Sequence, residues 1–497
     1  MATNRWLNTI NNLKTTADTL RGMLISGGVN AKPNDTLDTL VAQVPKLAPR
    51  IVEINEKWEP DPLWVFQDPY GSGASKTIRQ IYDEDPMADA YTYRGIYMFY
   101  GNTDDIDLKS VMGARTSADT FITSDGITYT DITETSLIHA WDKEKDITDS
   151  KNQTVRYVKI YTNTAWNCVP GFYRQLIWAI HNLGTVVGIS GTAPGYTKAY
   201  YLNGSTNVEC LEFGSKVSSL SSASPTTIGY PRKIRFEYAT NSTSIFPSYS
   251  NAPCWGRLMD IEFPNWTVFN NSAGTSYYLG SATMKSLEVN KEITQFTIYR
   301  DLFPSLQYIN LEGCDKLTSM TITTGRTYYY ADRYNSFNQM LYTSPEFIIP
   351  DSVTYLYISG GTYDTLYLPN NLTSLNLYYL PIKNLVIPES VTTLNLSYLH
   401  LEEITIPTLY GQTDLTTPVL TLNTLYDLKR INIPLDFNRT ANFSCDLLEH
   451  ENLLEILTNL KNNVGFTKKT LTLGTVNLSK LTDDEKAIAT NKNWTLA

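Results

Sequence analysis

The feature that most constrains the fold of this 497-residue chain is a proline that recurs every nineteen residues in the C-terminal third. Pro350, Pro369, Pro388 and Pro407 mark the period, and the apolar residues between them keep one register. Four apolar columns share this spacing (Leu356, Leu375, Leu394; Ile358, Leu377, Leu396; Leu366, Leu385, Ile404; Leu368, Ile387, Ile406). A fixed short period of this kind is the signature of stacked repeats.

The repeats extend beyond these prolines in both directions. Upstream, the stretch from Leu306 to Leu317 fits the leucine-rich repeat pattern L-x-x-L-x-L-x-x-C, and downstream Ile431-x-Ile433-Pro434 repeats the last columns after an eight-residue insertion. Each coil holds two short L-x-[IL] stretches and no helical pattern. We therefore predict a flattened leucine-rich-repeat β-solenoid over residues 286–440, with a sheet on each side.

A single coil of this kind is not stable alone. Burial of about six apolar side chains contributes roughly 9–18 kcal/mol, whereas ordering nineteen residues costs on the order of 28 kcal/mol. Neighbouring coils must supply the difference, and the last coil needs a cover.

Residues 441–497 are predicted to form that cover as an α/β cap. We expect a helix after Asp446 with Leu453, Leu457 and Leu460 on one face, and a strand at 471–474. A capping box from Thr482 to Glu485 opens a last helix through 489, and 494–496 form an edge strand.

Residues 1–45 are predicted to form a helical segment, because their apolar residues have a mean period of 3.5, the seam of a coiled coil. We expect Gly27 and Gly28 to end its first helix and a second short helix to follow. The seam either packs on that second helix, joins protomers into a dimer or trimer, or docks on another protein. The predicted oligomerisation residues are Trp6, Ile10, Leu13, Ala17, Leu20 and Leu24.

Residues 46–62 contain three prolines and read as a semi-extended linker. Residues 63–285 then show short apolar-aromatic runs separated by turn residues, and the chain as a whole has 34 Tyr and 27 Gly. We predict an irregular, sandwich-like β domain of undetermined topology. Its expected strands are Ile96–Tyr100, Tyr157–Tyr161, Val186–Ile189 and Ile234–Tyr238, and its best helix is Phe172–Ile180.

Motifs of known chemistry are missing from the sequence. It lacks G-x-S-x-G, H-E-x-x-H and both glycine-rich phosphate loops, and its four histidines lie far apart. We read the acidic clusters at 83–85, 104–107 and 144–146 as solvated turns, with calcium binding or glycoside hydrolysis as the alternatives. The expectation is a protein that is not an enzyme and has no cofactor, catalytic residue or metal site.

The composition limits partners and compartment. The formal charge is −10 and no basic run reaches four residues, which disfavours nucleic acid. No apolar stretch approaches a membrane span, and the polar start does not resemble a signal peptide. Five scattered cysteines, an odd number, read as reduced thiols. We expect synthesis and folding in the cytosol without membrane insertion.

One insertion in the repeats carries the candidate contact residues. Between Ile322 and Phe347 the repeat pattern stops, and insertions in repeat proteins often emerge on the binding face. Tyrosine side chains suit stacking on sugars or anchoring at an interface. The alternative is that these residues pack on the middle domain or on a neighbouring protomer. The candidates are Arg326, Tyr328, Tyr329, Tyr330, Arg333 and Tyr334.

Two parts of the sequence resemble known families. The repeat I-P-x-S-V-T-x-L-x-L with the tail from Leu471 to Ala497 resembles BspA-type leucine-rich repeat proteins of gut bacteria and their phages. Residues 11–47 resemble the helical start of phage tail and fibre proteins. The resemblance implies attachment to a virion through the N-terminus and a β-rich binding head that faces outward.

These features lead us to expect a structural virion protein of a bacteriophage, a tail or head (capsid) fibre or appendage for host-surface adhesion. Its expected partners are itself as a homo-oligomer, another virion protein, and a host-surface glycan or protein. The alternatives are a bacterial BspA-like surface adhesin, which predicts a secretion signal or anchor, and a tail-spike polysaccharide depolymerase, which needs paired carboxylates in a groove.

Overall fold

The computed structural model describes residues 21–22, 56–67, 74–100, 106–107, 121–123, 128–129, 137–138, 146–163, 176–182, 184, 208–217, 231–237, 258–273, 277–278, 280–281, 283–323, 344–363, 366–411 and 420–497. Over these residues the chain is mainly β, with few helices and several sheets. It divides into a first unit, Ile54–Lys316, and a second unit, which combines Met1–Glu53 with Leu317–Ala497.

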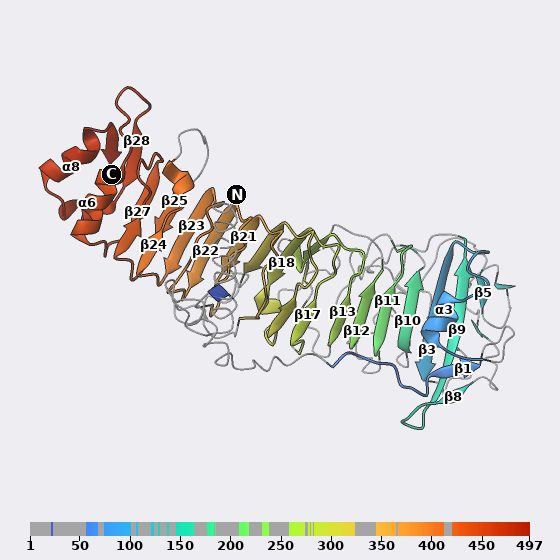
Figure 1. The fold of residues 1–497 in the computed structure, drawn as a ribbon. Coiled ribbons are helices and arrows are strands. Elements are labelled where there is room, and N and C mark those ends of the chain that lie inside the picture. Colours follow the sequence, from blue (N-terminus) through green and yellow to red (C-terminus); the bar gives the residue numbers. More distant parts are fainter. Residues whose placement is uncertain are drawn as a thin grey trace, which may run out of the picture. The chain divides into compact units, whose positions relative to one another are not determined.

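The main sheet of the first unit is mixed, with nine strands among the described residues. From β10 to β13 neighbouring strands are parallel, while β3 pairs antiparallel with both β10 and β9 (Figure 1). The order is β13 (Asp260–Glu262), β12 (Lys233–Phe236), β11 (Cys210–Phe213), β10 (Leu176–Asn182), β3 (Tyr93–Tyr100), β9 (Thr154–Thr162), β5 (Phe121–Thr123) and β6 (Thr128–Tyr129), with β8 (Ile147–Thr148) also on β9.

Smaller strand pairs complete the first unit. Two of them are parallel, β14 (Val268–Asn270) with β18 (Gln295–Tyr299) and β17 (Ser286–Glu288) with β19 (Tyr308–Asn310). The antiparallel pairs are β1 (Val65–Gln67) with β2 (Ser75–Thr77), β4 (Ile106–Asp107) with β7 (Leu137–Ile138), and β15 (Ser272–Ala273) with β16 (Tyr277–Tyr278). A 3-10 turn, η4 (Arg300–Leu302), follows β18.

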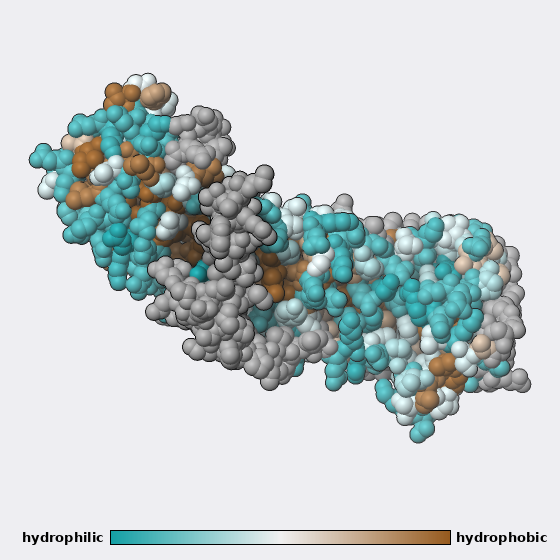
Figure 2. All heavy atoms as spheres, in the orientation of Figure 1, coloured by the Kyte–Doolittle hydropathy of each residue, from teal (hydrophilic) through white to brown (hydrophobic). Residues whose placement is uncertain are grey.

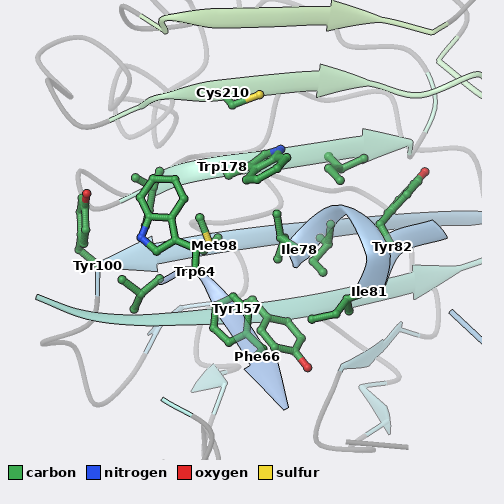
Figure 3. Packing of buried hydrophobic residues seen from close by; sticks show 14 residues of the cluster. Trp64, Phe66, Ile78, Ile81, Tyr82, Met98, Tyr100, Tyr157, Trp178 and Cys210 are labelled. Carbon is green, nitrogen blue, oxygen red and sulfur yellow. The ribbon is translucent and has the colours of Figure 1, made fainter. Parts of the chain in front are cut away.

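Helix α3 (Ile78–Asp83) covers one face of the main sheet. Thr77 and Gln80 form a capping box at its start, a signature that the sequence reading missed. The helix buries Ile78, Ile81 and Tyr82 against sheet residues that include Met98 and Trp178 (Figure 3). Full burial of side chains of this size contributes about 1.5–3 kcal/mol each, so this cluster anchors the helix to the sheet.

The stretch predicted as a linker contributes to the same cluster. Trp58 packs against it, with its ring centroid 5.2 Å from that of Trp178 in an edge-on contact and 6.4 Å from that of Trp64. Asp61 accepts hydrogen bonds from the backbone N–H groups of Leu63 and Ser150. The described end of this stretch is therefore held on the sheet.

Strand predictions in the first unit were right where the apolar run was long. Ile96–Tyr100 and Tyr157–Tyr161 lie in β3 and β9, and β12 takes up the start of Ile234–Tyr238. The predicted helix Phe172–Ile180 is wrong, because Leu176–Asn182 is strand β10 with all seven residues buried. A central strand covered on both faces reads as a continuous apolar run, which periodicity cannot separate from a helix. Val186–Ile189 lies outside the described residues.

The second unit is built on a row of parallel strands with the predicted register. Leu356 lies opposite Leu375 and Leu375 opposite Leu394, and the second column pairs in the same way. Both columns are fully buried, which confirms the nineteen-residue spacing as a packing repeat. The order is β20 (Ser319–Thr323), β21 (Tyr355–Ser359), β22 (Ser374–Leu380), β23 (Thr393–Leu399), β25 (Leu420–Asn423), β27 (Ala441–Ser444), β28 (Lys469–Thr472) and β29 (Trp494–Leu496) (Figure 1).

The predicted second sheet is shorter than the sequence suggested. Within the described residues of the second unit it consists of β24 (Glu403–Thr405) paired parallel with β26 (Arg430–Asn432). Residues 366–368 and 385–387 form no strand, so the prediction of two strands in every coil is wrong there. Leu385 and Ile387 are only half-buried, whereas Ile404 and Ile406 at the same places in the β24 coil are buried.

The C-terminal cap largely follows the prediction. Helix α6 (His450–Asn459) buries Leu453 and Leu457, α8 (Asp483–Thr490) begins at the predicted capping box, and β29 is the last strand of the row. Asn452 of α6 bonds both backbone polar groups of Ile431 in β26 (2.9 and 3.1 Å). Strand β28 begins two residues before its predicted position, and α7 (Gly474–Ser479) was not predicted. A short 3-10 turn, η6 (Thr408–Gly411), precedes β25.

Candidate functional site

Four successive strands of the second unit have a left-handed residue at an equivalent position at or near their ends. Tyr379 and Tyr398 lie one residue before the ends of β22 and β23, and Thr424 directly follows β25; their φ angles are 56°, 60° and 50°. Gly360 takes the equivalent place after β21, with φ 73°. The left-handed residue therefore recurs in these four described coils, and of the four positions only that of β21 is occupied by glycine.

Tyrosine is an expensive choice for this turn. A left-handed conformation costs a residue other than glycine about 1–2 kcal/mol. Strain of this kind is kept where the surrounding structure over-determines it, and it gathers at functional sites. The left-handed conformation of Tyr379 and Tyr398 therefore indicates a candidate functional site.

The side chains at these turns form a continuous aromatic arrangement, which we call the tyrosine row: Tyr379, Tyr398, Tyr426 and His400. The rings of Tyr379 and Tyr398 are stacked, with centroids 4.3 Å apart and planes 7° apart. Tyr426 lies 6.4 Å from Tyr398 and 5.1 Å from His400, on which it stacks. Aromatic contacts contribute about 0.5–1.5 kcal/mol each beyond their area burial, which offsets part of the strain.

The tyrosine row is accessible to a ligand. Tyr379 is 43% and Tyr426 49% exposed, and His400 is exposed to a similar degree. Stacking covers the facing sides of the Tyr379 and Tyr398 rings, so at this contact a ligand can reach only their edges and hydroxyls. Partial burial and the neighbouring Tyr398 hydroxyl raise the pKa of Tyr379 above its usual value, so its phenol is protonated at neutral pH.

The groups around the tyrosine row are polar and mostly uncharged. His400 Nδ1 and Asp427 Oδ2 are 2.9 Å apart, so any charge on this imidazole has its counter-charge beside it. Within β22 and β23, Asn395 donates a hydrogen bond to Asn376 Oδ1 (2.7 Å), and the rings of Tyr357 in β21 and Tyr378 in β22 are 5.5 Å apart. The surface offers hydrogen-bonding groups with little net charge.

A second group of polar residues lies in the first unit and is internally paired. Arg79 of α3 bonds Asp83, Glu212 and Glu237, and Trp178 donates its indole N–H to Glu212. Burial disfavours the charge on Arg79, but these three carboxylates outweigh it and raise the pKa of the guanidinium. Such a network ties α3 to the parallel strands and leaves no cation poised for a ligand within it.

The first acidic cluster is less solvated than predicted. Asp85 is buried, where it accepts a hydrogen bond from Tyr161 Oη (2.5 Å) and lies 3.3 Å from Lys159 Nζ. Its neighbour Glu84 pairs with Lys76 on the surface. Asp146, from the third cluster, pairs with Arg156 at 2.8 Å. Carboxylates held in ion pairs are structural here, and among the described residues no three metal-ligating side chains gather at one point.

The contact residues predicted from the sequence are not among those described. The oligomerisation residues (Trp6, Ile10, Leu13, Ala17, Leu20, Leu24) and the insertion residues (Arg326, Tyr328, Tyr329, Tyr330, Arg333, Tyr334) all lie outside the described ranges. The tyrosine row was missed, although Tyr379 and Tyr398 are nineteen residues apart and thus share a place in the repeat. The repeated tyrosine was the available signal.

Cysteines and helices in the described ranges add little to a functional assignment. Cys210, Cys314 and Cys445 are free and buried, and burial raises the pKa of each thiol, which makes them unreactive. Cys168 and Cys254 lie outside these ranges.

Among the described residues, no helix has the length and apolar character needed to cross a bilayer.

Comparison with known proteins finds a distant structural similarity. The chain matches no protein-family model and no curated protein. A leucine-rich repeat protein from Eubacterium ventriosum is 13% identical to it, with 54% of this chain and 83% of that chain covered and a TM-score of 0.16.

Proposed function

We propose that this chain is a structural virion protein of a bacteriophage, a fibre or appendage on the tail or head. It attaches through its N-terminus and presents a β-rich head for adhesion to the host surface. The observation that carries the proposal is the tyrosine row, an exposed aromatic site in which Tyr379 and Tyr398 occupy strained positions of the repeat. Adhesion needs such a surface, held rigidly, rather than a reactive group.

We further propose that the repeats form a leucine-rich-repeat β-solenoid closed by an α/β cap. The support is the parallel pairing of equivalent residues in successive coils and the two buried leucine columns beneath it. Parallel coils bury their faces on one another, so side chains on the turns are repeated at the coil spacing of ~4.8 Å. A solenoid is thereby suited to present a line of identical contacts.

Immunoelectron microscopy tests the proposal. Antibodies raised against the purified chain are applied to intact phage particles from a culture that carries the gene for this chain. We expect the antibodies to label an appendage on the head or tail of the particles. Preimmune serum is the control. Labelling of the surface of uninfected bacteria, with particles left bare, would instead favour the bacterial adhesin and overturn the virion assignment.

A further inference from the structure

We propose that the tyrosine row binds a linear neutral glycan through hydrogen bonds to its phenol and imidazole groups. This inference rests on the proposed adhesion function and names its ligand class. Tyr379, Tyr398 and Tyr426 come from three successive coils, those of β22, β23 and β25, with ring centroids 4.3 and 6.4 Å apart, and His400 of the β23 coil lies 5.1 Å from Tyr426. A series of rings with polar groups on successive coils complements a chain molecule whose own hydroxyls recur along its length.

The stacking decides how the ligand is recognised. With planes only 7° apart, Tyr379 and Tyr398 cover each other's faces, so a sugar cannot lie flat on the ring at that contact. The edges and hydroxyls remain for the ligand, and a phenol both donates and accepts a hydrogen bond. Recognition by the tyrosine row thus depends on the hydroxyl groups, while the rings serve to hold them in place.

The charges in and around the tyrosine row favour a neutral glycan over an anionic one. The ionisable groups of the site, His400 and Asp427, lie 2.9 Å from each other, and the nearby Asn376, Asn395 and Tyr357 are polar residues without a formal charge. The whole chain carries a formal −10, which repels a polyanion. An acidic polysaccharide would find no unpaired cation in this cluster.

The small size of the tyrosine row favours a glycan over a protein partner. A stable protein interface uses about 20–30 residues on each side, whereas the tyrosine row presents four side chains in a narrow line. An extended single chain can follow such a line, and hydroxyl-rich ligands obtain specificity from a few well-placed hydrogen bonds. The row therefore fits a thin, polar ligand.

The decisive variant is the triple substitution Tyr379→Phe, Tyr398→Phe and Tyr426→Phe, which keeps the rings and removes only the hydroxyls. The matched control is Phe466→Ser, which changes a 71% exposed apolar side chain on the turn before β28, outside the tyrosine row. Figure 2 shows that apolar side chains, drawn in brown, are exposed in the C-terminal part of the chain. Both proteins should match the wild type in circular dichroism and melting temperature, because neither substitution alters a buried contact.

Binding is measured to intact host cells and to the neutral and anionic polysaccharide fractions extracted from them. We expect the wild type and Phe466→Ser to bind cells and the neutral fraction equally, and the triple variant to bind at least tenfold more weakly. Equal binding by the triple variant, or competition by the anionic fraction alone, would overturn the glycan assignment. Failure of the wild type to bind the cells at all would instead count against the proposed adhesion function.

Discussion

His181 is a buried ionisable residue whose state the fold fixes. It lies in β10 with its Nδ1 atom 2.9 Å from the hydroxyl of Tyr97, and complete burial lowers its pKa to about 3. The unfolded chain binds a proton at this residue below about pH 6.5, while the folded chain remains neutral there. A group whose pKa falls on folding makes stability decline as the pH falls through that window.

We expect the free energy of unfolding of the first unit to fall by about 2–3 kcal/mol from this residue alone between pH 6.5 and 4.5. The substitution His181→Asn keeps a polar partner for Tyr97 and removes the titration, so it should flatten the pH dependence in this range. Urea unfolding at several pH values measures the effect. If the free energy of unfolding depended on pH equally in the variant and the wild type, His181 would not be held neutral in the folded chain.

At the scale of the element, the leucine columns carry the second unit. Leu394 of β23 is fully buried between Leu375 and Leu420 of the neighbouring strands. We predict that Leu394→Asp costs at least about 4 kcal/mol, because it removes apolar burial and places an unpaired carboxylate in the stack. The thermal transition of the second unit should disappear or fall sharply while that of the first unit stays.

Thr393→Asp provides the control for that experiment, since Thr393 is only half-buried and lies on the other face of the same strand. It should leave both calorimetric transitions within a few degrees of the wild type. If Leu394→Asp and Thr393→Asp behaved alike, the assignment of the buried column would fail.

The same element scale shows what the sequence could predict. The nineteen-residue period records which residues lie opposite each other in successive coils, so the pairing of Leu356, Leu375 and Leu394 was predictable. The mixed sheet was not, because β10 pairs with β3 across some eighty residues without any repeated pattern. The prediction of a helix at β10 was wrong for a separate reason. Burial on both faces of this strand removes the alternation of apolar and polar residues that identifies a strand in a sequence.

The candidate site was less predictable than the fold. Glycine is the residue that prefers a left-handed conformation. Gly360 follows this preference, whereas Tyr379 and Tyr398 adopt the same conformation against it. Departures from local preference are expected at functional or strained positions. A prediction based on this preference therefore misses the tyrosine row and favours the insertion between Ile322 and Phe347, whose candidate tyrosines lie outside the described residues.

For the whole molecule, the N-terminal seam predicts self-association. Deletion of residues 1–45 removes the 3.5-residue apolar period, and an isolated helix of that length needs a partner. We expect the full chain to form a dimer or trimer and the truncated chain a folded monomer, as measured by multi-angle light scattering. An unchanged oligomeric mass after truncation would place the association elsewhere in the chain.

The central claim concerns adhesion, and competition for the host surface tests it most directly. Host cells are incubated with the purified full-length chain before phage is added, and the rate of phage adsorption is measured against chain concentration. The account predicts that adsorption falls as the surface becomes saturated, and that the Phe466→Ser control protein inhibits equally. Unchanged adsorption at saturating concentrations of folded protein would contradict it.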